Sequence, residues 1–275
     1  MSRRVGGPAR LPAGGDIRWT PTEPAASVGG MEQQDIWDAE TAEQYDTPGQ
    51  GMFADEVLRP AVDRLAALAG TGAALEFAIG TGRVAVPLTE RGVPVTGIEL
   101  SPPMVEVLRT KAEEAAIPVV MGDMATTGAP GEYTLVYLVF NTIANLLTQD
   151  EQVSCFRNAA RHLRPGGRFV VELWVPELRT LPPGRTATVC RSEPGYIGLD
   201  TYDVVSQHVV SHHFRFDESR QARLFRTPHR YVWPAELDLM ARLAGFELET
   251  RHADWDGAPF TADSPSHVSV YRLPA

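Results

Sequence analysis

The chain is poor in cysteine and in positive charge, and both shortages restrict what it can do. Its 275 residues include two cysteines, 25 Lys and Arg, and 35 Asp and Glu, which gives a formal net charge of −10. Cys155 and Cys190 do not have the spacing of a metal motif, and we interpret both as buried thiols in a reducing cytoplasm. Nucleic acids and anionic membranes attract basic surfaces, so neither is expected as a partner.

Long apolar runs are also missing. No stretch of about 18 apolar residues occurs, so the sequence predicts no transmembrane helix. The first residues hold two arginines but no apolar stretch after them, which argues against a secretory signal. Gly, Pro and Ala are frequent in residues 1–30, which we predict to be a disordered tail preceding one folded domain over residues 31–275.

What the chain does contain is a regular alternation of short apolar strands with helices. Strands are predicted at 74–79, 93–100, 118–123, 134–140 and 167–174. Helices are predicted between them at 82–92, 101–116 and 148–163. Such an alternation is typical of an α/β fold in which helices cover both faces of a doubly wound parallel sheet.

The pattern changes after Trp174. Polar and apolar residues alternate through residues 180–232, which predicts an antiparallel β insertion covering the acceptor site. A helix at 234–245 and two closing strands complete the expected domain. No internal repeat is visible.

A glycine turn follows the first predicted strand. Gly80 and Gly82 flank Thr81 where the strand gives way to a helix, and glycine allows backbone to approach a ligand closely. Glu99 ends the second strand, 19 residues after Gly80. In a doubly wound sheet this carboxylate lies beside the glycine turn and can accept hydrogen bonds from two ribose hydroxyls. These residues therefore predict a nucleoside site.

The combination "LEFAIGTGRVAVPL", "GIELSPPMVEVLRTK", "VVMGDM" and "LRPGGRFVVE" resembles the core of the class I S-adenosylmethionine-dependent methyltransferases. The segment around Tyr45 resembles members that act on antibiotic aminosugars. The resemblance implies a seven-stranded sheet of order 3-2-1-4-5-7-6 with strand 7 antiparallel. It also implies that Asp123 and Met124 contact adenine and that Glu76 supports the methionine amino group. The full expected cofactor site comprises Tyr45, Glu76, Ala78, Gly80, Thr81, Gly82, Glu99, Leu100, Met104, Asp123, Met124 and Phe140.

Residues that do chemistry on the acceptor are harder to select, because alignment of the two reactants can supply most of the acceleration. We select Asn141, just after the fourth strand, and His212, which shares a strand face with His208. Each has a structural alternative, as a helix cap and as a half-exposed strand residue. No metal site is expected, since no carboxylate lies at a helpful spacing from these histidines.

The sequence therefore predicts a methyltransferase that uses S-adenosyl-L-methionine to methylate a nitrogen or oxygen atom of a small molecule, in specialised metabolism. The alternatives are an NAD(P)-dependent oxidoreductase and a non-catalytic nucleoside-binding protein of the same fold. The protein is expected in the cytoplasm, and a homodimer is compatible with the sequence.

Overall fold

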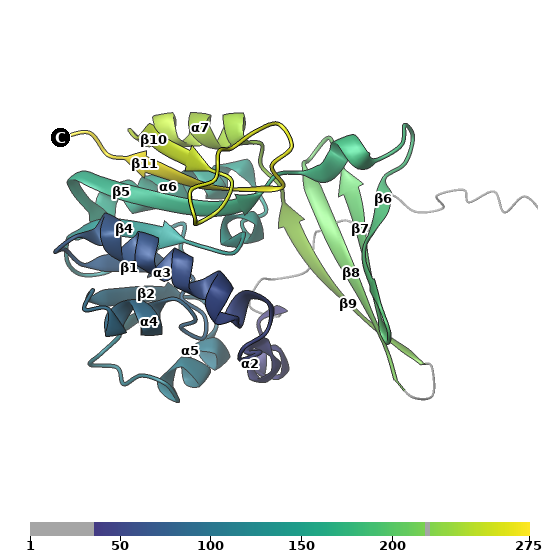
Figure 1. Ribbon diagram of the computed structural model, residues 1–275, viewed down its shortest axis with the longest axis horizontal. Helices are drawn as coiled ribbons and strands as arrows, with labels where there is room; N and C mark the ends of the chain where they lie inside the picture. Colours follow the sequence, from purple (N-terminus) through teal and green to yellow (C-terminus); the bar gives the residue numbers. More distant parts are fainter. Residues whose placement is uncertain (1–35, 218–220) are drawn as a thin grey trace, which may run out of the picture.

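A computed structural model describes residues 36–217 and 221–275. The tail predicted for residues 1–30 lies outside the described residues. Figure 1 shows a larger α/β body and, beside it, a smaller sheet that continues from the body's longest strand.

The larger body is built on a seven-stranded sheet of order β10-β11-β5-β4-β1-β2-β3. Neighbouring strands are parallel except that β11 is antiparallel to both β5 and β10. The predicted fold class and strand order are thus confirmed. The strands are β1 Ala74–Phe77, β2 Val95–Glu99, β3 Val119–Met121, β4 Tyr133–Leu138, β5 Leu163–Trp174, β10 Glu247–His252 and β11 Ser266–Arg272.

Helices cover both faces of this sheet and produce two apolar cores. Residues of α6 (Gln149–His162) and α7 (Pro234–Leu243) belong to one core, with Phe156 packed against strand residues. Residues of α3 (Asp55–Ala69), α4 (Ala85–Glu90) and α5 (Pro102–Arg109) belong to the other. Central strands can be apolar along their whole length because both of their faces are buried.

Two helices are shorter than predicted. The helix expected at 82–92 begins only at Ala85, which places Pro87 in its first turn, where a missing N–H costs no hydrogen bond. The helix expected at 101–116 ends at Arg109. The Arg109 guanidinium donates to the carbonyls of Ala112 (3.4 Å) and Ile117 (3.1 Å), which stabilises the turns that replace the last part of the helix.

The insertion forms an antiparallel sheet of four strands in sequence order. These are β6 Ala187–Glu193, β7 Tyr196–Asp203, β8 His208–Phe216 and β9 Ala222–Arg230. Cys190 lies in β6 and is exposed, so our expectation of a buried thiol is wrong for this residue and right for Cys155. An outer strand of a thin sheet has a solvent-facing side, which alternation alone does not distinguish from a core-facing one.

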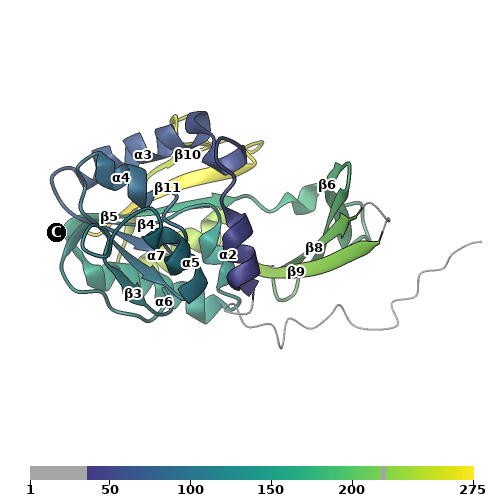
Figure 2. The same cartoon turned by 90° about the horizontal axis from the view of Figure 1, so that it is seen from below.

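One short helix lies between the two sheets. Figure 2 shows α2 (Ala39–Tyr45) between the larger body and β8–β9. At this position Arg223 of β9 donates to both carboxylate oxygens of Glu40 (2.9 and 3.3 Å). Arg215 of β8 donates to Gln44 Oε1 (3.2 Å). The small sheet and the helix before the main body are therefore in direct contact.

Candidate functional site

Backbone strain is concentrated at the carboxyl ends of β1 and β4. Ala78 has φ of 51°, Phe140 of 53° and Asn141 of 66°, values that non-glycine residues rarely adopt. The glycine turn next to them is also left-handed. Strained backbone of this kind persists where surrounding structure holds it, and it clusters at ligand and active sites. In doubly wound sheets, ligands bind at the carboxyl ends of the strands, and the strained residues lie at this same edge.

The two glycines of the turn do different things. A Cβ on Gly82 would lie 2.3 Å from Leu108 Cδ1, so this glycine lets the turn pack closely on α5. A Cβ on Gly80 would meet nothing closer than a carbonyl oxygen at 3.9 Å. With φ of 56°, Gly80 still favours glycine, but the space beside it stays open to a ligand.

Glu99 is held at the end of β2 by backbone donors. Its Oε2 accepts from Gly80 N and its Oε1 from Ser101 N, each at 2.8 Å. The residue is 5% exposed, and burial raises the pKa of its carboxyl against the opposing effect of these N–H groups. Each oxygen keeps a second lone pair. The carboxylate is therefore oriented beside the glycine turn and can still accept from two hydroxyls.

Glu76 lies in β1 below the same turn. It is 3% exposed, and its Oε2 accepts a hydrogen bond of 2.9 Å from Tyr137 Oη. Burial raises the pKa of Glu76 to about 8, while the Tyr137 hydroxyl and the nearby Arg83 act in the other direction. A carboxyl in this state is ready to ionise when a cation arrives.

A polar cluster that the sequence did not reveal ties the end of α2 to the glycine turn. Thr81 Oγ1 donates to Asp46 Oδ1 (2.6 Å), and the other Asp46 oxygen forms an ion pair with Lys111. Lys111 Nζ also donates to Thr81 O (2.7 Å). These contacts join residues 30 and 35 positions apart, so no local motif could have indicated them.

Tyr45 stands directly before this cluster. Its ring meets those of Trp37 and Phe53 edge to face, with centroids 5.8 and 6.0 Å away. Arg83, which sequence reasoning also missed, lies over the ring of Phe53 and over that of Phe140 (5.4 Å to the centroid). Phe53, before β1, and Phe140, after β4, thus both contact the guanidinium of Arg83.

The remaining expected cofactor residues lie along the ends of β2 and β3. Asp123 Oδ1 accepts from Ala125 N (2.6 Å), which fixes the turn after β3. Leu100 is 38% exposed, whereas Met104 and Met124 are buried. Leu100 is thus accessible at this edge of the sheet, whereas the side chain of Met124, which was expected to contact adenine, is covered by the protein.

Asn141 joins the ends of two strands. Its Oδ1 accepts from Trp174 N (2.7 Å), so it links the residues after β4 to the end of β5. It precedes the 3-10 helix η2 (Thr142–Asn145) but makes no side-chain cap bond to it. Next to it, Phe140 N donates to Glu172 Oε2 (2.7 Å) and the Phe140 side chain is 46% exposed.

His212 faces away from this edge. Strand alternation in β8 puts His213 on the side that also carries His229, since Val209 pairs with His229 and His213 with Phe225. His212 is on the opposite side, where its Nδ1 accepts from Arg226 Nε (3.2 Å) and its Nε2 bonds Thr201 Oγ1 (3.0 Å). This placement does not support a role for His212 beside the acceptor.

Two hollows lie between the small sheet and the body. One of about 420 Å³ lies at the end of β5, between the 3-10 helix η3 (Glu177–Thr180) and the sheet face that carries His229. Its wall includes Trp174, Asp200 and Tyr202. The other, of about 800 Å³, lies between α2 and the far ends of β8 and β9.

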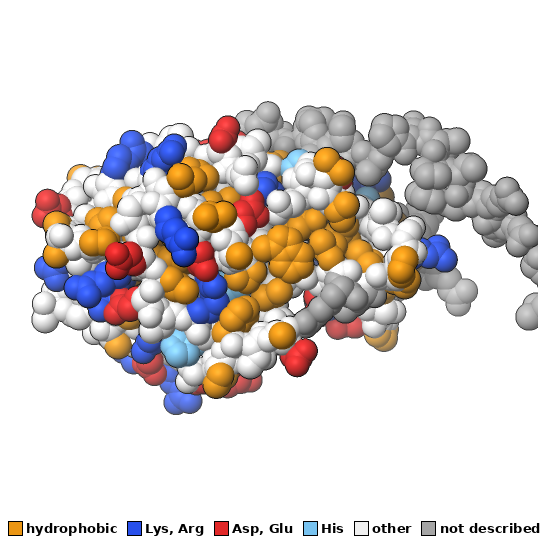
Figure 3. All heavy atoms as spheres, turned by 90° about the horizontal axis from the view of Figure 1, so that it is seen from above, with side chains coloured by type: hydrophobic (Ala, Val, Ile, Leu, Met, Phe, Trp, Pro, Cys, Tyr) orange, Lys and Arg blue, Asp and Glu red, His pale blue; other side chains and the backbone are white. Residues whose placement is uncertain are grey.

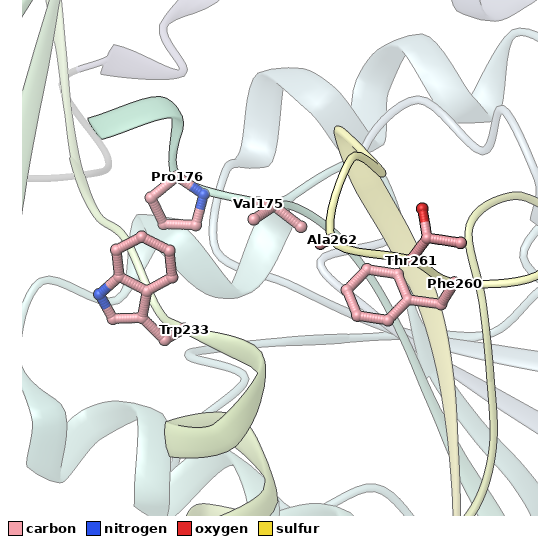
Figure 4. A pocket seen from close by; sticks show the side chains of 6 residues that line it. All are labelled: Val175, Pro176, Trp233, Phe260, Thr261 and Ala262. Atoms are coloured by element: carbon pink, nitrogen blue, oxygen red, sulfur yellow. The ribbon is translucent and has the colours of Figure 1, made fainter. Parts of the chain in front are cut away.

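A third hollow is apolar and is separate from the two just described. Figure 3 shows hydrophobic side chains gathered on the face seen from above, and Figure 4 shows Trp233 and Pro176 on one side of the hollow and Phe260 on the other. Its volume is about 360 Å³, and no titratable side chain lines it. Of the other aromatic residues that the sequence suggested for an acceptor pocket, Tyr231 belongs to the core and Trp255 Nε1 donates to Glu172 (2.9 Å).

The described residues contain no group of three or more His, Cys, Asp or Glu placed to hold a metal ion. Within the same part of the chain, no helix is long and apolar enough to cross a membrane.

A doubly wound sheet of order β3-β2-β1-β4-β5-β11-β10, with a glycine turn after β1 and an oriented carboxylate at the end of β2, defines a class I S-adenosylmethionine-dependent methyltransferase. Residues 74–167 match the family model described as "Methyltransferase domain". The structure of the CcbJ methyltransferase from Streptomyces caelestis is 39% identical and superposes with a TM-score of 0.74, over 86% of this chain and 96% of that one.

Two curated relatives extend the comparison. A cypemycin N-terminal methyltransferase from Streptomyces sp is 27% identical, with 87% of this chain and 98% of the relative aligned. The dTDP-3-amino-3,6-dideoxy-alpha-D-glucopyranose N,N-dimethyltransferase of Streptomyces fradiae is 31% identical over 66% of this chain and 68% of its own length. The chain belongs to the S-adenosylmethionine-dependent methyltransferases, and S-adenosylmethionine is its cofactor. The oxidoreductase and non-catalytic alternatives have no support among these relatives.

Proposed function

We propose that the protein methylates an amine nitrogen of a small molecule, such as an aminosugar-bearing intermediate of specialised metabolism. The observation that carries this proposal is the chamber between the strained sheet edge and the second sheet, with Trp174 in its wall. Of the two curated relatives described above, one is named as an N-terminal methyltransferase of cypemycin and the other as an N,N-dimethyltransferase of an amino-dideoxy sugar nucleotide. The likeness to these relatives favours nitrogen over oxygen.

The cofactor roles belong to the same proposal. Glu99 would accept from the ribose hydroxyls, Asp123 and Leu100 would contact adenine, and Glu76 would face the methionine ammonium, with Gly80 close to the ligand. The free lone pairs on Glu99 and the open space at Gly80 fit such a group. When bound, S-adenosylmethionine supplies a methyl group on a sulfonium, whose C–S bond breaks as the acceptor's lone pair forms the new bond.

This chain's own contribution is orientation and exclusion of water. Arg83, Tyr45 and Phe140 enclose the rim of the site from two elements. The second sheet and α2 enclose the side on which an acceptor would enter. Holding two reactants in line can supply about 7–11 kcal/mol of the barrier reduction, more than the roughly 3–5 kcal/mol that a positioned base adds.

The domain organisation and the partners are proposals of the same kind. We propose that residues 180–232 cover the acceptor, that nucleic acid is not a substrate, and that the protein acts in the cytoplasm, where the cofactor is made. The acidic charge of −10 favours a small acceptor over a nucleic acid. A homodimer stays a prediction that sedimentation velocity would test.

The acceptor proposal is tested by methyl transfer from tritiated cofactor to matched compounds. We expect transfer to 3-amino-3-deoxy-D-glucose and none to its N-acetyl derivative or to glucose. Transfer to glucose at an equal rate would show that a hydroxyl is the acceptor. Transfer to a peptide N-terminus alone would replace the small molecule by a peptide.

A further inference from the structure

His229 occupies a fixed position on the inward face of the second sheet. It lies in β9, and its ring meets that of Trp174 edge to face with centroids 5.9 Å apart. Its Nδ1 lies 3.1 Å from Asn145 Oδ1. An amide oxygen only accepts, so Nδ1 carries the proton and Nε2 has the free lone pair. Among the described residues, Nε2 makes no hydrogen bond.

The cavity beside His229 is suited to a cation. Its volume is about 420 Å³, and the acidic side chains in its wall are Glu177 and Asp200, with no Lys or Arg. Asp200 Oδ1 is buried and has no hydrogen-bond partner within residues 36–217 and 221–275. A buried carboxylate oxygen without a donor is costly, and a ligand that donates a hydrogen bond would remove that cost.

We propose that this cavity receives the acceptor as an ammonium ion and that His229 Nε2 removes a proton from the reacting nitrogen before methylation. The inference rests on the proposed amine acceptor. Asn145 is a positioning residue, since it acts by keeping the proton on Nδ1. Asp200, on β7 and on the same sheet face as His229, binds a second donor group of the same acceptor.

The proton step is balanced within the site. The N–H bond of the ammonium breaks and its electron pair stays on nitrogen, which becomes a nucleophile. The proton forms a bond to Nε2, and the resulting imidazolium returns it to water at the mouth of the cavity. Burial, with a smaller effect of His213, lowers the pKa of His229 to about 4. The imidazole is therefore neutral near pH 7, and Nε2 is free to accept a proton. Transfer from an ammonium to a base of low pKa is uphill, so it depends on the acidic side chains in the cavity wall stabilising the imidazolium and on release of the proton to water.

Other titratable groups surround His229, and any pH profile includes their influence. They come from η3, β6, β7 and β8 and are Glu177, Cys190, Asp200, Tyr202 and His213. Arg230 follows His229 on its own strand and is engaged with Gln152, Gln207 and Glu236. A substitution of His229 therefore needs a control substitution of another histidine that leaves these surrounding groups unchanged.

The kinetic test compares His229→Gln with His212→Gln, whose side chain is on the other face of the same sheet. With 3-amino-3-deoxy-D-glucose as probe, H229Q should lower kcat by about 100-fold at pH 7 and by only a few fold at pH 9.5, where the amine is already neutral. H212Q should stay within about twofold, and both should bind S-adenosylhomocysteine like the wild type. Equal rates for H229Q and the wild type would overturn the proposal and leave the amine acceptor standing.

A measurement without turnover tests the geometry. Nitrogen-15 spectra of histidine-labelled wild-type protein should show His229 as the neutral Nδ1–H tautomer, and Asn145→Ala should give a mixture of tautomers. A proton on Nε2 in the wild type would contradict the proposal whatever the kinetics show. If the wild type methylates neither the probe nor a peptide amine, the amine acceptor and the role of His229 both fall.

Discussion

Tyr137 Oη donates a hydrogen bond of 2.9 Å to Glu76 Oε2 in the interior of the sheet, directly below the glycine turn. Both residues are buried. A buried carboxyl group favours its neutral form when no positive charge is near and its ionised form when a cation binds beside it. This pair connects occupation of the proposed cofactor site to protonation.

Cofactor binding should therefore release a proton near neutral pH. The pKa of Glu76 is raised to about 8 in the free protein, and the methionine ammonium would stabilise the ionised form. Affinity for S-adenosylhomocysteine should rise as pH increases from 6 to 8 and then level off. Calorimetry in buffers of different ionisation enthalpy measures the released proton, and Glu76→Gln should abolish it. A pH-independent affinity with no proton released would contradict this assignment.

Tyr137→Phe tests the same pair by removing the hydroxyl and keeping the Glu76 carboxyl. Loss of the hydroxyl removes a hydrogen bond that lowers the pKa of Glu76, so the midpoint of the pH-dependent affinity should move up by about 1 unit. The measurement is the same titration, with thermal unfolding to show that the fold is kept. A midpoint that moves down would mean that the hydroxyl does not stabilise the carboxylate.

Asp46 should couple the helix before the body to the glycine turn. Asp46→Asn removes the charge that faces Lys111, and the half-buried lysine is left without a counter-ion. We expect a loss of about 1–3 kcal/mol in the free energy of unfolding, and weaker cofactor binding because an amide oxygen accepts from Thr81 Oγ1 less strongly than a carboxylate does. A double-mutant cycle with Lys111→Met isolates the pair. Additive effects in that cycle would show that the two residues do not interact.

Asn141 combines strained backbone with a side-chain bond, and two variants separate them. Asn141→Gly relieves the left-handed φ of 66° but loses the bond to Trp174 N, whereas Asn141→Ala loses the bond and keeps the strain. N141A should therefore be less stable than N141G by about 1 kcal/mol in urea unfolding. Equal stability would show that the backbone conformation relaxes when the side chain is removed.

His267 should make stability depend on pH. Burial lowers the pKa of His267 to about 4, below the 6.5 of an exposed histidine, so its neutral form is the one that the fold accepts. The contribution of neutral His267 to the free energy of unfolding is fully present above pH 6.5. As the pH falls from 6.5 toward 4, up to about 3 kcal/mol of this free energy is lost. His267→Gln should reduce the slope of unfolding free energy against pH in that window, and His252→Gln, in β10, serves as the control. An unchanged slope in H267Q would refute this.

The sequence predicted the alternation of strands and helices, because apolar strands and the glycine turn are local signals, and the family resemblance supplied the sheet order. The sequence also placed the cofactor residues at the strand ends, which stays a prediction. It did not predict Asp46 with Lys111, whose contact depends on how α2 folds back over the body. It selected His212, which lies on the sheet face away from the cavity, since alternation assigns residues to two faces of a strand without telling which face meets the body. The wrong prediction that Cys190 is buried has the same cause.

The central claim is that an adenosyl group is held at the carboxyl ends of β1, β2 and β3 by Glu99. Calorimetric titration of S-adenosylhomocysteine into the wild type and Glu99→Gln tests it most directly. Loss of charge-assisted bonds to two ribose hydroxyls should weaken binding by about 30-fold or more. Thermal stability should also fall, because the amide of glutamine cannot accept from both Gly80 N and Ser101 N as the carboxylate does. Binding of equal strength in the two proteins would contradict the account.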